Sequence, residues 1–442
     1  MAQMQLPQDL GDSLILRWAT PADTEALAAF NTRIHADSPD DPAEYLAHWT
    51  RDLMNGNHPT TRAGDFTVVM DEKADGRIVS SMNLISQTWT YDGIEFGVGR
   101  PELVGTDEAY RRRGLVRAQF AAIHAKSAAR GELAQVITGI PWYYRQFGYE
   151  MTVALGDGRR FDWITPGHDK QVDEEVYRMR PAVAADIPVL AELYGRYCQG
   201  SLLSRVRDEA VWRYEMSVAH RESPYARHFH IIETTAGEVA GYVEYAQWGT
   251  SFTVREIAVL PGQSLRAVAL FLTRVLHARA QELNKEREKP ITAVQFSQSS
   301  GHPLYEALER ELMQVRQPYA WYIRVPDLPA FLRHIASVLE ARLAGSVMAG
   351  YSGKLRLNFY ASQLALIWEN GRLQDITPYE ASHFYDCDAF FPNLSFLQLL
   401  FGYRTAAEIK YILPDCYVPK ADTAVLLQAI FPKRPSWVLA MG

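Results

Sequence analysis

The chain has 442 residues, of which 48% are hydrophobic and 22% charged, and its formal net charge is −7. This length predicts about two to four domains, and the composition excludes a disordered or fibrous protein. The negative charge argues against general nucleic-acid binding. No apolar run approaches the ~18 residues that cross a bilayer, and the start has no basic segment before an apolar one, so we expect neither a membrane span nor an export signal.

The chain contains three cysteines, Cys198, Cys387 and Cys416. Their spacing matches no metal-binding pattern, and their odd number does not suit a disulfide framework. We therefore expect a reducing, cytoplasmic setting, no structural disulfide and no metal site.

The first predicted element is a strand at 14–18, followed by a turn at Thr20-Pro21 and a helix with Leu27 and Phe30 on one face. The same pattern recurs 163 positions later, where six of the twelve residues at 180–191 are identical to those at 17–28. This similarity favours an internal duplication. A chance likeness of alanine-rich helix starts is the alternative.

Both segments continue in the same order. Strand candidates at 67–72, 77–91 and 102–106 precede a helix at 114–131, and candidates at 228–235, 238–248 and 251–260 precede a helix at 265–283. Strands followed by one amphipathic helix predict a mixed α/β (α+β) layer fold. The polar stretch at 162–175 is typical of a linker between the two.

Beyond residue 325 the composition changes. A helix is predicted at 331–345, a hairpin at 354–376 with its turn at Asn370-Gly371, and short helices around 396–409. We interpret this part as a third, smaller α+β domain. The predicted domains are therefore 1–165, 166–325 and 326–442.

The stretch "YRRRGLVR" at 110–117 lies between the strand that ends near Thr106 and a helix. A helix N-terminus carries unsatisfied N–H groups and partial positive charge. A pyrophosphate could lie against the N–H groups of residues 112–115, with arginines adding charge-assisted hydrogen bonds and Gly114 allowing close approach. A solvated basic helix start is the alternative.

A second motif, "VITGIPWYYRQFGYE" at 136–150, contains Tyr144 ahead of Phe147, Gly148 and Tyr149. A phenol hydroxyl near a departing thiolate can act as its general acid. The alternatives are a buried packing role for Tyr144, or the same chemistry at Tyr143.

Together these motifs resemble those of the GNAT N-acetyltransferases, whose R-x-x-G-x-small signature is matched by Arg111, Gly114 and Val116. The resemblance implies direct acetyl transfer from acetyl-CoA to an amine, with Tyr144 as general acid. It also implies that acetyl-CoA is bound by the main chain of the strand before the motif and by the loop. These residues are Val104, Thr106, Arg111, Arg112, Arg113, Gly114 and Leu115.

The second copy tests this assignment, because matching the two long helices sets residues 111–114 opposite Ser264, Leu265, Arg266 and Ala267. The phosphate loop is absent there, so we expect only the first copy to bind CoA. Tandem GNAT units with a degenerate second copy and a small C-terminal domain resemble the Eis (enhanced intracellular survival) type over nearly the whole chain. That resemblance implies a sterol-carrier-protein-like last domain and a homo-oligomer, a hexamer.

The base in that family is the C-terminal carboxylate, which is Gly442 here. Eis-type chains tend to end in an aromatic residue, so this chain departs from the pattern, and a frayed tail is the alternative. Glu102, on the predicted strand before the loop, is a substitute base or a surface glutamate.

For the acceptor, we expect a primary amine of a small cationic molecule or a lysine. Four carboxylates near aromatic residues, at Asp37, Asp40, Asp41 and Glu44, could receive such a cation, although a solvated charge run is the alternative. Two other functions stay open: use of a different acyl or aminoacyl donor, and a lipid- or small-molecule-binding protein whose GNAT units are inert.

Overall fold

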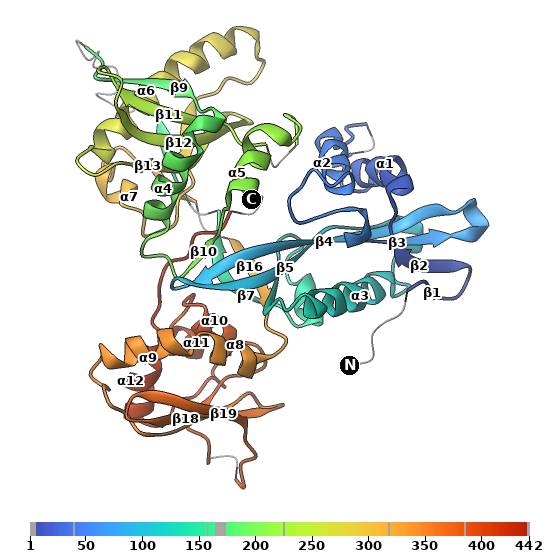
Figure 1. The fold of residues 1–442 in the computed structure, drawn as a ribbon, viewed down its shortest axis with the longest axis vertical. Helices are drawn as coiled ribbons and strands as arrows, with labels where there is room; N and C mark the ends of the chain where they lie inside the picture. Colours follow the sequence, from blue (N-terminus) through green and yellow to red (C-terminus); the bar gives the residue numbers. More distant parts are fainter. Residues whose placement is uncertain are drawn as a thin grey trace.

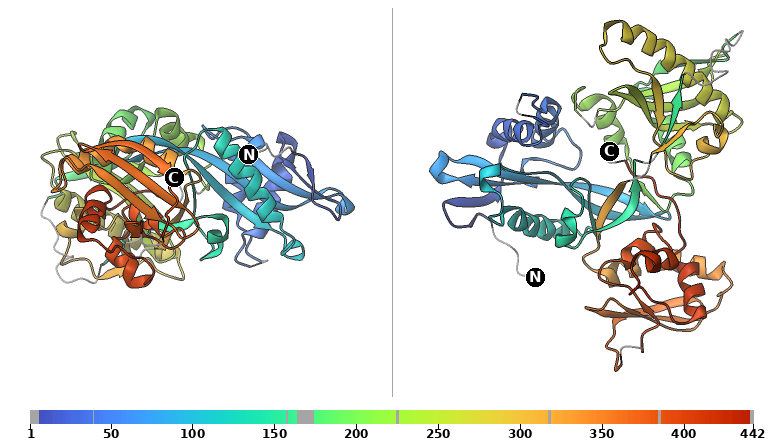
Figure 2. Two further views of the ribbon diagram at one scale, coloured as in Figure 1. Left: turned by 90° about the horizontal axis from the view of Figure 1, so that it is seen from below. Right: turned by 180° about the vertical axis from the view of Figure 1, so that it is seen from behind.

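A computed structural model describes residues 6–38, 40–156, 158–163, 174–223, 226–316, 319–383 and 386–439. The chain forms three lobes, each built on one β-sheet (Figure 1). The first lobe is elongated and carries the blue-to-teal, N-terminal part of the chain. The other two lobes lie at one end of it in both views of Figure 2. Within the described ranges, no helix combines the length and the apolar character needed to cross a membrane.

The first sheet has nine strands. Its order is β1-β2-β3-β4-β5-β6-β16-β7, and β10 pairs with the far end of β4. The strands are β1 (Gln8–Asp9), β2 (Leu14–Trp18), β3 (Phe66–Asp71), β4 (Arg77–Tyr91), β5 (Ile94–Thr106), β6 (Ala134–Ile137), β16 (Tyr319–Arg324), β7 (Glu150–Leu155) and β10 (Leu203–Arg205).

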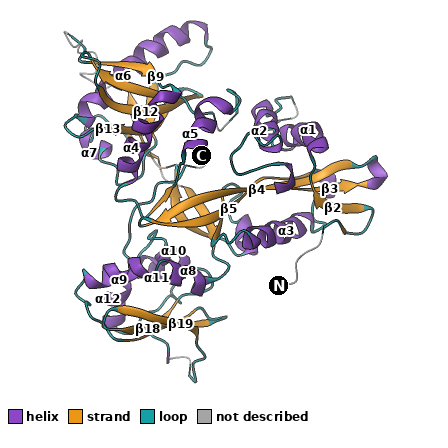
Figure 3. Cartoon of the chain, in the orientation of Figure 1, coloured by secondary structure: helices purple, strands orange, loops and turns teal. Residues whose placement is uncertain are grey.

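Helices cover both faces of the first sheet (Figures 1 and 3). α1 (Thr24–Ile34) and α2 (Glu44–Met54) pack on one face through a cluster that includes Leu27, Phe30 and Trp49. α3 (Leu115–Ala129) packs on the other face through Phe120 and Ile123. The 3.6-residue spacing of these apolar positions is what makes each helix bury one side.

The second sheet has seven strands in the order β15-β8-β14-β13-β12-β11-β9. The strands are β15 (Gln314–Arg316), β8 (Gly158–Asp162), β14 (Ala293–Phe296), β13 (Ser251–Val259), β12 (Val239–Trp248), β11 (Phe229–Thr234) and β9 (Tyr177–Pro181). The helices of this lobe are α4 (Ile187–Cys198), α5 (Glu209–Arg213), α6 (Leu265–Leu283) and α7 (Leu304–Ala307).

The first two sheets exchange strands. β8 pairs with β14 of the second sheet, although it follows β7 of the first sheet directly. In return, β16 lies between β6 and β7 of the first sheet, although it follows the second sheet in sequence. The predicted boundaries at 165 and 325 therefore do not coincide with the sheets, because 158–162 belong to the second and 319–324 to the first.

The third sheet has the order β19-β18-β17-β20, with β17 (Gly353–Asn358), β18 (Gln363–Glu369), β19 (Arg372–Pro378) and β20 (Ala389–Phe390). The β18–β19 turn falls at Asn370-Gly371, where both residues have positive φ as a type I′ hairpin turn requires. The helices of this lobe are α8 (Leu328–His334), α9 (Ala336–Ala344), α10 (Phe396–Leu400), α11 (Ala406–Ile412) and α12 (Ala421–Ile430). The single helix predicted at 331–345 is thus two helices that meet at Ile335.

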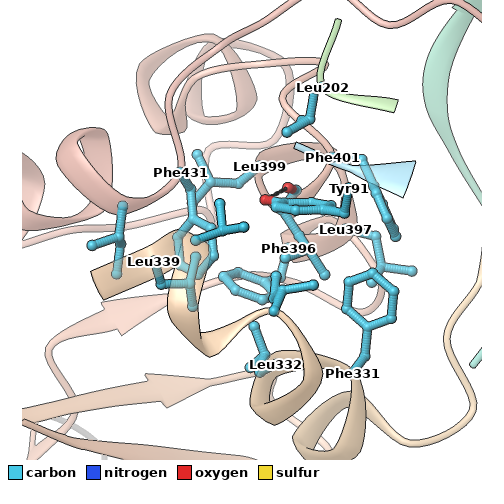
Figure 4. Packing of buried hydrophobic residues seen from close by; sticks show 14 of the residues in the cluster. Tyr91, Leu202, Phe331, Leu332, Leu339, Phe396, Leu397, Leu399, Phe401 and Phe431 are labelled. Carbon is cyan, nitrogen blue, oxygen red and sulfur yellow. Dashed lines mark hydrogen bonds between the residues drawn. The ribbon is translucent and has the colours of Figure 1, made fainter. Parts of the chain in front are cut away.

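A shared apolar cluster attaches the third lobe to the first sheet (Figure 4). Tyr91 of β4 enters this cluster beside Phe331 and Phe401, and its hydroxyl donates to the Leu400 carbonyl at 2.7 Å. Because buried aromatic rings contribute large apolar areas, this contact fixes the third lobe against the end of β4 and β5.

The two similar strand-turn-helix segments make the same polar contacts. Arg17 forms a bidentate ion pair with Asp23, with N–O distances of 2.9 and 2.7 Å, and Arg180 forms one with Asp186 at 2.7 and 2.9 Å. In both segments the aspartate also accepts the backbone N–H three residues before it. The identical residues thus serve one local purpose, which is to fix the turn that begins each helix.

Candidate active site

The loop before α3 has a backbone that exposes N–H groups. Arg112 has φ of 64° and Gly114, the N-cap of α3, has φ of 79°, both in the left-handed region. Among the described residues, the N–H groups of Arg112, Arg113 and Gly114 have no recorded acceptor. Such turns create concave anion sites, and a non-glycine residue in this region is a feature of functional sites.

The arginine side chains of this loop differ in their contacts. Arg113 pairs with Asp12 at 2.7 Å, and Arg111 lies 3.6 Å from Glu108 with 58% of its side chain exposed. No partner of the Arg112 guanidinium is recorded among the described residues, and all three arginines are exposed. The helix start therefore combines open N–H groups with at least one uncommitted cation, which fits a phosphate group.

One edge of β5 is open beside this loop. β5 pairs with β6 only at Val98–Ala134 and Gly99–Gln135, and the two strands then separate. The predicted contact residues Val104 and Thr106 lie on the separated part. Backbone groups on such an edge can pair with an extended ligand as they would with another strand.

A β-bulge changes the direction of β5 at the same place. Ser81 pairs with Gly105 and Asn83 with Glu102, so that Leu103 and Val104 share one position opposite Met82. Leu103 has φ of 51°. As a result Leu103 packs toward α1 and α2, whereas Val104 packs against the cluster that contains Tyr144. Bulges of this kind re-aim side chains next to active sites.

Tyr144 lies in the gap between β5 and β6. It is 3% exposed and packs with Val104 of β5, Ile137 of β6 and Phe120 of α3. Its hydroxyl has no hydrogen bond recorded to a described residue. A Cβ atom at Gly139 would lie 3.4 Å from that hydroxyl, so glycine leaves the space beside it open.

Burial raises the pKa of Tyr144 above the usual value of 10, and the charge of Glu102 raises it further. The hydroxyl is therefore a proton donor throughout the neutral range. Tyr143, its rival in the sequence analysis, is only half-buried and stacks edge-on against it at 5.4 Å.

β16 completes the site with residues that the sequence analysis missed. The Tyr322 ring lies 5.7 Å from that of Tyr144, and its hydroxyl accepts the Trp142 N–H at 2.6 Å. Tyr319 donates to the Gly139 carbonyl at 3.0 Å. These tyrosines hold the loop that carries Tyr144. The sequence near Tyr144 does not indicate this contact, because β16 follows the second sheet in the chain.

Glu102 faces the side of the sheet that carries α1 and α2. Its carboxylate accepts two hydrogen bonds from Arg100, at 2.8 and 2.6 Å, and is 16% exposed, so it is not an ordinary surface glutamate. The buried Arg100 guanidinium lies over the Trp321 ring at 4.9 Å, and the Trp321 indole donates to the Val438 carbonyl at 3.0 Å. The described end of the chain therefore reaches the same part of the sheet. Gly442, the other predicted base, lies outside the described residues.

The second lobe has a different helix start. The N-cap of α6 is Ser264, whose side chain accepts the Ala267 N–H at 3.2 Å, and Arg266 is paired with Glu311. Gly114 therefore corresponds to Ser264 when the N-caps are matched, and not to Ala267 as helix matching in the sequence predicts. The reason is that α6 begins three residues earlier than α3 when the two helices are matched by sequence.

The gap after β13 and β14 is also different, because protein groups fill it. Ser297 N–H and the Gln298 side chain both donate to the Val254 carbonyl at 2.9 Å. The Tyr305 hydroxyl, unlike that of Tyr144, is within hydrogen-bonding distance of Gln298 N at 2.9 Å and of the Phe296 carbonyl at 3.1 Å.

The carboxylates considered for the acceptor, Asp37, Asp40, Asp41 and Glu44, are exposed around the start of α2. Nearby, His48 of α2 meets His220 and Glu222 of the second lobe, with ligand atoms within 4.8 Å of one another. The two imidazole rings are stacked at 3.7 Å, and His48 Nε2 lies 3.1 Å from Glu222 Oε2. This group joins the lobes beside α2.

Comparison with known families identifies the class of the first lobe. Residues 17–152 match the family model described as an acetyltransferase (GNAT) domain. This range contains the α3 loop, the open edge of β5 and Tyr144. The chain therefore carries a GNAT acetyltransferase domain. Among curated proteins, no sequence relative is found.

Solved structures resemble the whole chain. A GCN5-related N-acetyltransferase from Kribbella flavida has a TM-score of 0.65 and 19% identity, covering 96% of this chain and 97% of that one. A probable N-acyltransferase from Enterococcus faecalis V583 has a TM-score of 0.67 and 14% identity, over 96% and 98%. Eis1 from Mycobacterium abscessus has a TM-score of 0.61 and 13% identity, over 97% and 99%. At these identities the comparison establishes the mixed α/β fold.

Proposed function

We propose that the chain is an N-acetyltransferase that transfers the acetyl group of acetyl-CoA to a primary amine. The observation that carries this proposal is the combination of open N–H groups at the start of α3, an unpaired edge of β5, and the Tyr144 hydroxyl in the gap between β5 and β6. All three belong to the segment that matches the GNAT family model.

In this proposal the pyrophosphate of acetyl-CoA lies against the N–H groups of residues 112–115. The positive end of α3 and the exposed arginines, Arg111 to Arg113, stabilise its charge. Pantetheine then extends along β5 and pairs with main-chain groups of Val104 and Thr106, in the place that β6 leaves open.

The chemical step is direct transfer. The neutral amine attacks the thioester carbonyl carbon, a C–N bond forms, and the C–S bond breaks. The Tyr144 hydroxyl gives its proton to the departing sulfur, and the proton lost by the amine returns to Tyr144 through a base or water. The raised pKa of Tyr144 supports this role, because the hydroxyl stays protonated until the thiolate develops.

Glu102 is the described carboxylate best placed to receive the amine proton. It lies at the bulge of β5, and its charge acts on Tyr144. Arg100 fixes its orientation through two hydrogen bonds. The carboxylate of Gly442 stays the rival hypothesis.

The wider organisation is also a proposal. Two GNAT units, of which the second has lost its phosphate loop, would explain why the Arg17–Asp23 contact recurs at Arg180–Asp186. The third lobe would then be the sterol-carrier-protein-like domain of the Eis type. Assembly into a homo-oligomer and a cytoplasmic location belong to the same proposal, and we propose no nucleic-acid or membrane partner.

The proposed acceptor is a small cationic amine or a lysine side chain. A panel of amines, assayed by release of free CoA thiol, tests this directly. Calorimetric titration with acetyl-CoA separates the proposed enzyme from the alternative, a small-molecule-binding protein with inert GNAT units. Absence of acetyl-CoA binding would overturn the proposed acetyltransferase function.

A further inference from the structure

The segment that carries Tyr144, residues 140–148, has little regular structure of its own. Its one helical turn, Tyr143–Phe147, is of the 3₁₀ type and lies between Trp142, with φ of 66°, and Gly148, with φ of 87°. The hydrogen-bond geometry of 3₁₀ turns is poor, so such a turn adds little rigidity. The position of the Tyr144 hydroxyl therefore depends on contacts that other elements make with this Tyr144 segment.

The residue next to Tyr144 makes one of these contacts. Arg145 donates to Glu150 Oε1 at 2.7 Å, and the Glu150 side chain is 1% exposed. The Arg145 guanidinium also lies over the Trp142 ring at 4.2 Å. Glu150 is the first residue of β7, which pairs with β16. The ion pair therefore joins the Tyr144 segment to the first sheet.

The third lobe binds the same carboxylate oxygen. α10 lies beside β7 (Figure 1), and its buried residue Gln398 donates through Nε2 to Glu150 Oε1 at 3.2 Å. The Gln398 Oε1 atom accepts from Arg404 at 3.0 Å. One end of the amide thus faces an anion and the other a cation, which fixes its orientation toward Glu150.

The buried charge of Glu150 depends on these partners. Burial raises the pKa of Glu150, and Arg145 and the Gln398 amide oppose that increase. The recorded hydrogen bonds of the carboxylate go to Oε1, including one from the Met151 N–H at 3.1 Å, and Oε2 has no partner among the residues that the structure describes. Loss of the Gln398 donor would favour the neutral carboxyl, which binds Arg145 more weakly.

We propose that Glu150 is a positioning residue for Tyr144, and that the third lobe keeps the general acid in place through Gln398. This inference rests on the proposed acetyl transfer and gives the third lobe a part in it. Glu150 acts through Arg145, the neighbour of Tyr144, and takes no proton in the reaction. Small displacements matter here, because a shift of about 1 Å in a reacting group can lower the rate about 10²-fold.

The first test is a double-mutant cycle on kcat, measured by release of CoA thiol. Glu150→Gln, which keeps the size and removes the charge, should lower kcat about tenfold, and Gln398→Met should lower it about fivefold. Neither should change the KM for acetyl-CoA by more than about twofold. In the Tyr144→Phe background both should change kcat by less than about twofold, because they act through a hydroxyl that is already absent. Full losses in that background would overturn the proposal.

Arg342→Met is the matched control for loosening of the third lobe. Arg342 of α9 joins this lobe to Asp92, in the turn between β4 and β5, at 3.0 Å. Its replacement should lower the free energy of unfolding but leave kcat within about twofold. A loss of kcat equal to that in Gln398→Met would show that any loosening of the lobe has the same effect, and would contradict a specific contact.

Hydrogen exchange of the full chain tests the contact without any activity. Glu150→Gln and Gln398→Met should each speed amide exchange in the Tyr144 segment at least about threefold, whereas Arg342→Met should leave it unchanged. Unchanged exchange in both of the first two variants would overturn the link to the third lobe. An unchanged kcat in Tyr144→Phe would instead overturn the general acid itself, so the two failures are distinguishable.

Discussion

The starts of α3 and α6 occupy equivalent places in two sheets, yet one is open and the other is closed. At α3 the N-cap is Gly114, and the preceding N–H groups have no recorded acceptor. At α6 the Ser264 side chain takes an N–H group, and Arg266 is bound to Glu311. In our proposal, a few side chains therefore decide whether a helix start can bind an anion.

The gap between β5 and β6 and the gap after β13 and β14 differ in the same way, since the first is open and the second is filled. In the first sheet the Tyr144 hydroxyl lies in the gap without a recorded partner. In the second, Gln298 and Tyr305 bond each other and the neighbouring backbone. A hydroxyl that must act on a ligand is left unpaired, whereas a structural hydroxyl is satisfied. This contrast is what we expect if the first lobe carries the proposed site and the second lobe does not.

The largest expected effect is that of removing the unpaired hydroxyl. Tyr144→Phe should lower kcat by about 10²–10⁴-fold, the usual contribution of general acid catalysis, with little loss of stability. Because burial keeps the pKa of Tyr144 raised, the ratio of wild-type to variant kcat should be constant from pH 7 to 9. CoA thiol release measures both quantities.

Tyr305→Phe is the matched control in the second lobe. It should leave kcat within about twofold but lower the free energy of unfolding by about 1–3 kcal/mol, because the Gln298 N–H loses its partner. Equal kinetic effects of the two substitutions would contradict the contrast between the gaps.

The next largest effect concerns the open helix start. Arg112→Leu combined with Gly114→Ser removes the uncommitted cation and gives α3 the N-cap residue of α6. It should weaken acetyl-CoA binding by about 100-fold, because a charged partner is lost and a Cβ is added at positive φ. Arg117→Gln is the control, since that arginine bonds Gln146 and lies over Phe147. Calorimetry that found equal losses in both variants would count against a specific phosphate site.

Acid should destabilise both lobes, unlike the substitutions above. Burial lowers the pKa of His58 in the first lobe to about 3 and that of His302 in the second to about 4. Below about pH 6.5 these imidazoles bind protons in the unfolded chain but stay neutral in the folded one. The free energy of unfolding therefore falls as the pH decreases from about 6.5 toward the two folded pKa values. Each histidine should contribute about 1 kcal/mol per pH unit.

Urea unfolding at pH 7 and pH 5 measures this loss. His58→Gln should reduce the difference between the two pH values. If the difference were the same as in the wild type, the neutral buried state of His58 would be wrong.

The smallest expected effect is no change in acetyl-CoA binding when the start of α6 is opened. Ser264→Gly with Glu311→Gln opens the second helix start, but the gap stays filled, so no second acetyl-CoA should bind. The loss of an exposed ion pair and a cap should cost about 1–2 kcal/mol of stability. A gain of acetyl-CoA binding would show that the helix start alone decides the difference.

The sequence predicts the local elements well where their signals are local. The strand at 14–18, the helix at 265–283 and the Asn370-Gly371 turn lie where periodicity and turn chemistry place them. The loop before α3 is likewise identified, because glycine and arginine at a helix start are a local signal.

The strand exchange could not be predicted in the same way. The continuous apolar run "YAWYIR" of β16 would suit either sheet, and only tertiary pairing decides between them. Tyr319 and Tyr322 were therefore absent from the predicted site. The hydrogen bond between Arg100 and Glu102 could not be predicted either. Residues two apart on one strand share a face of the sheet, but the sequence does not show whether their side chains bond.

The central claim is that one of two similar lobes binds acetyl-CoA. Isothermal titration of the wild-type chain with acetyl-CoA tests it most directly. We expect one site per chain, which disappears in the Arg112→Leu, Gly114→Ser variant and persists in Tyr144→Phe. A stoichiometry of two, or of zero, or binding that survives the change at the start of α3 would contradict it.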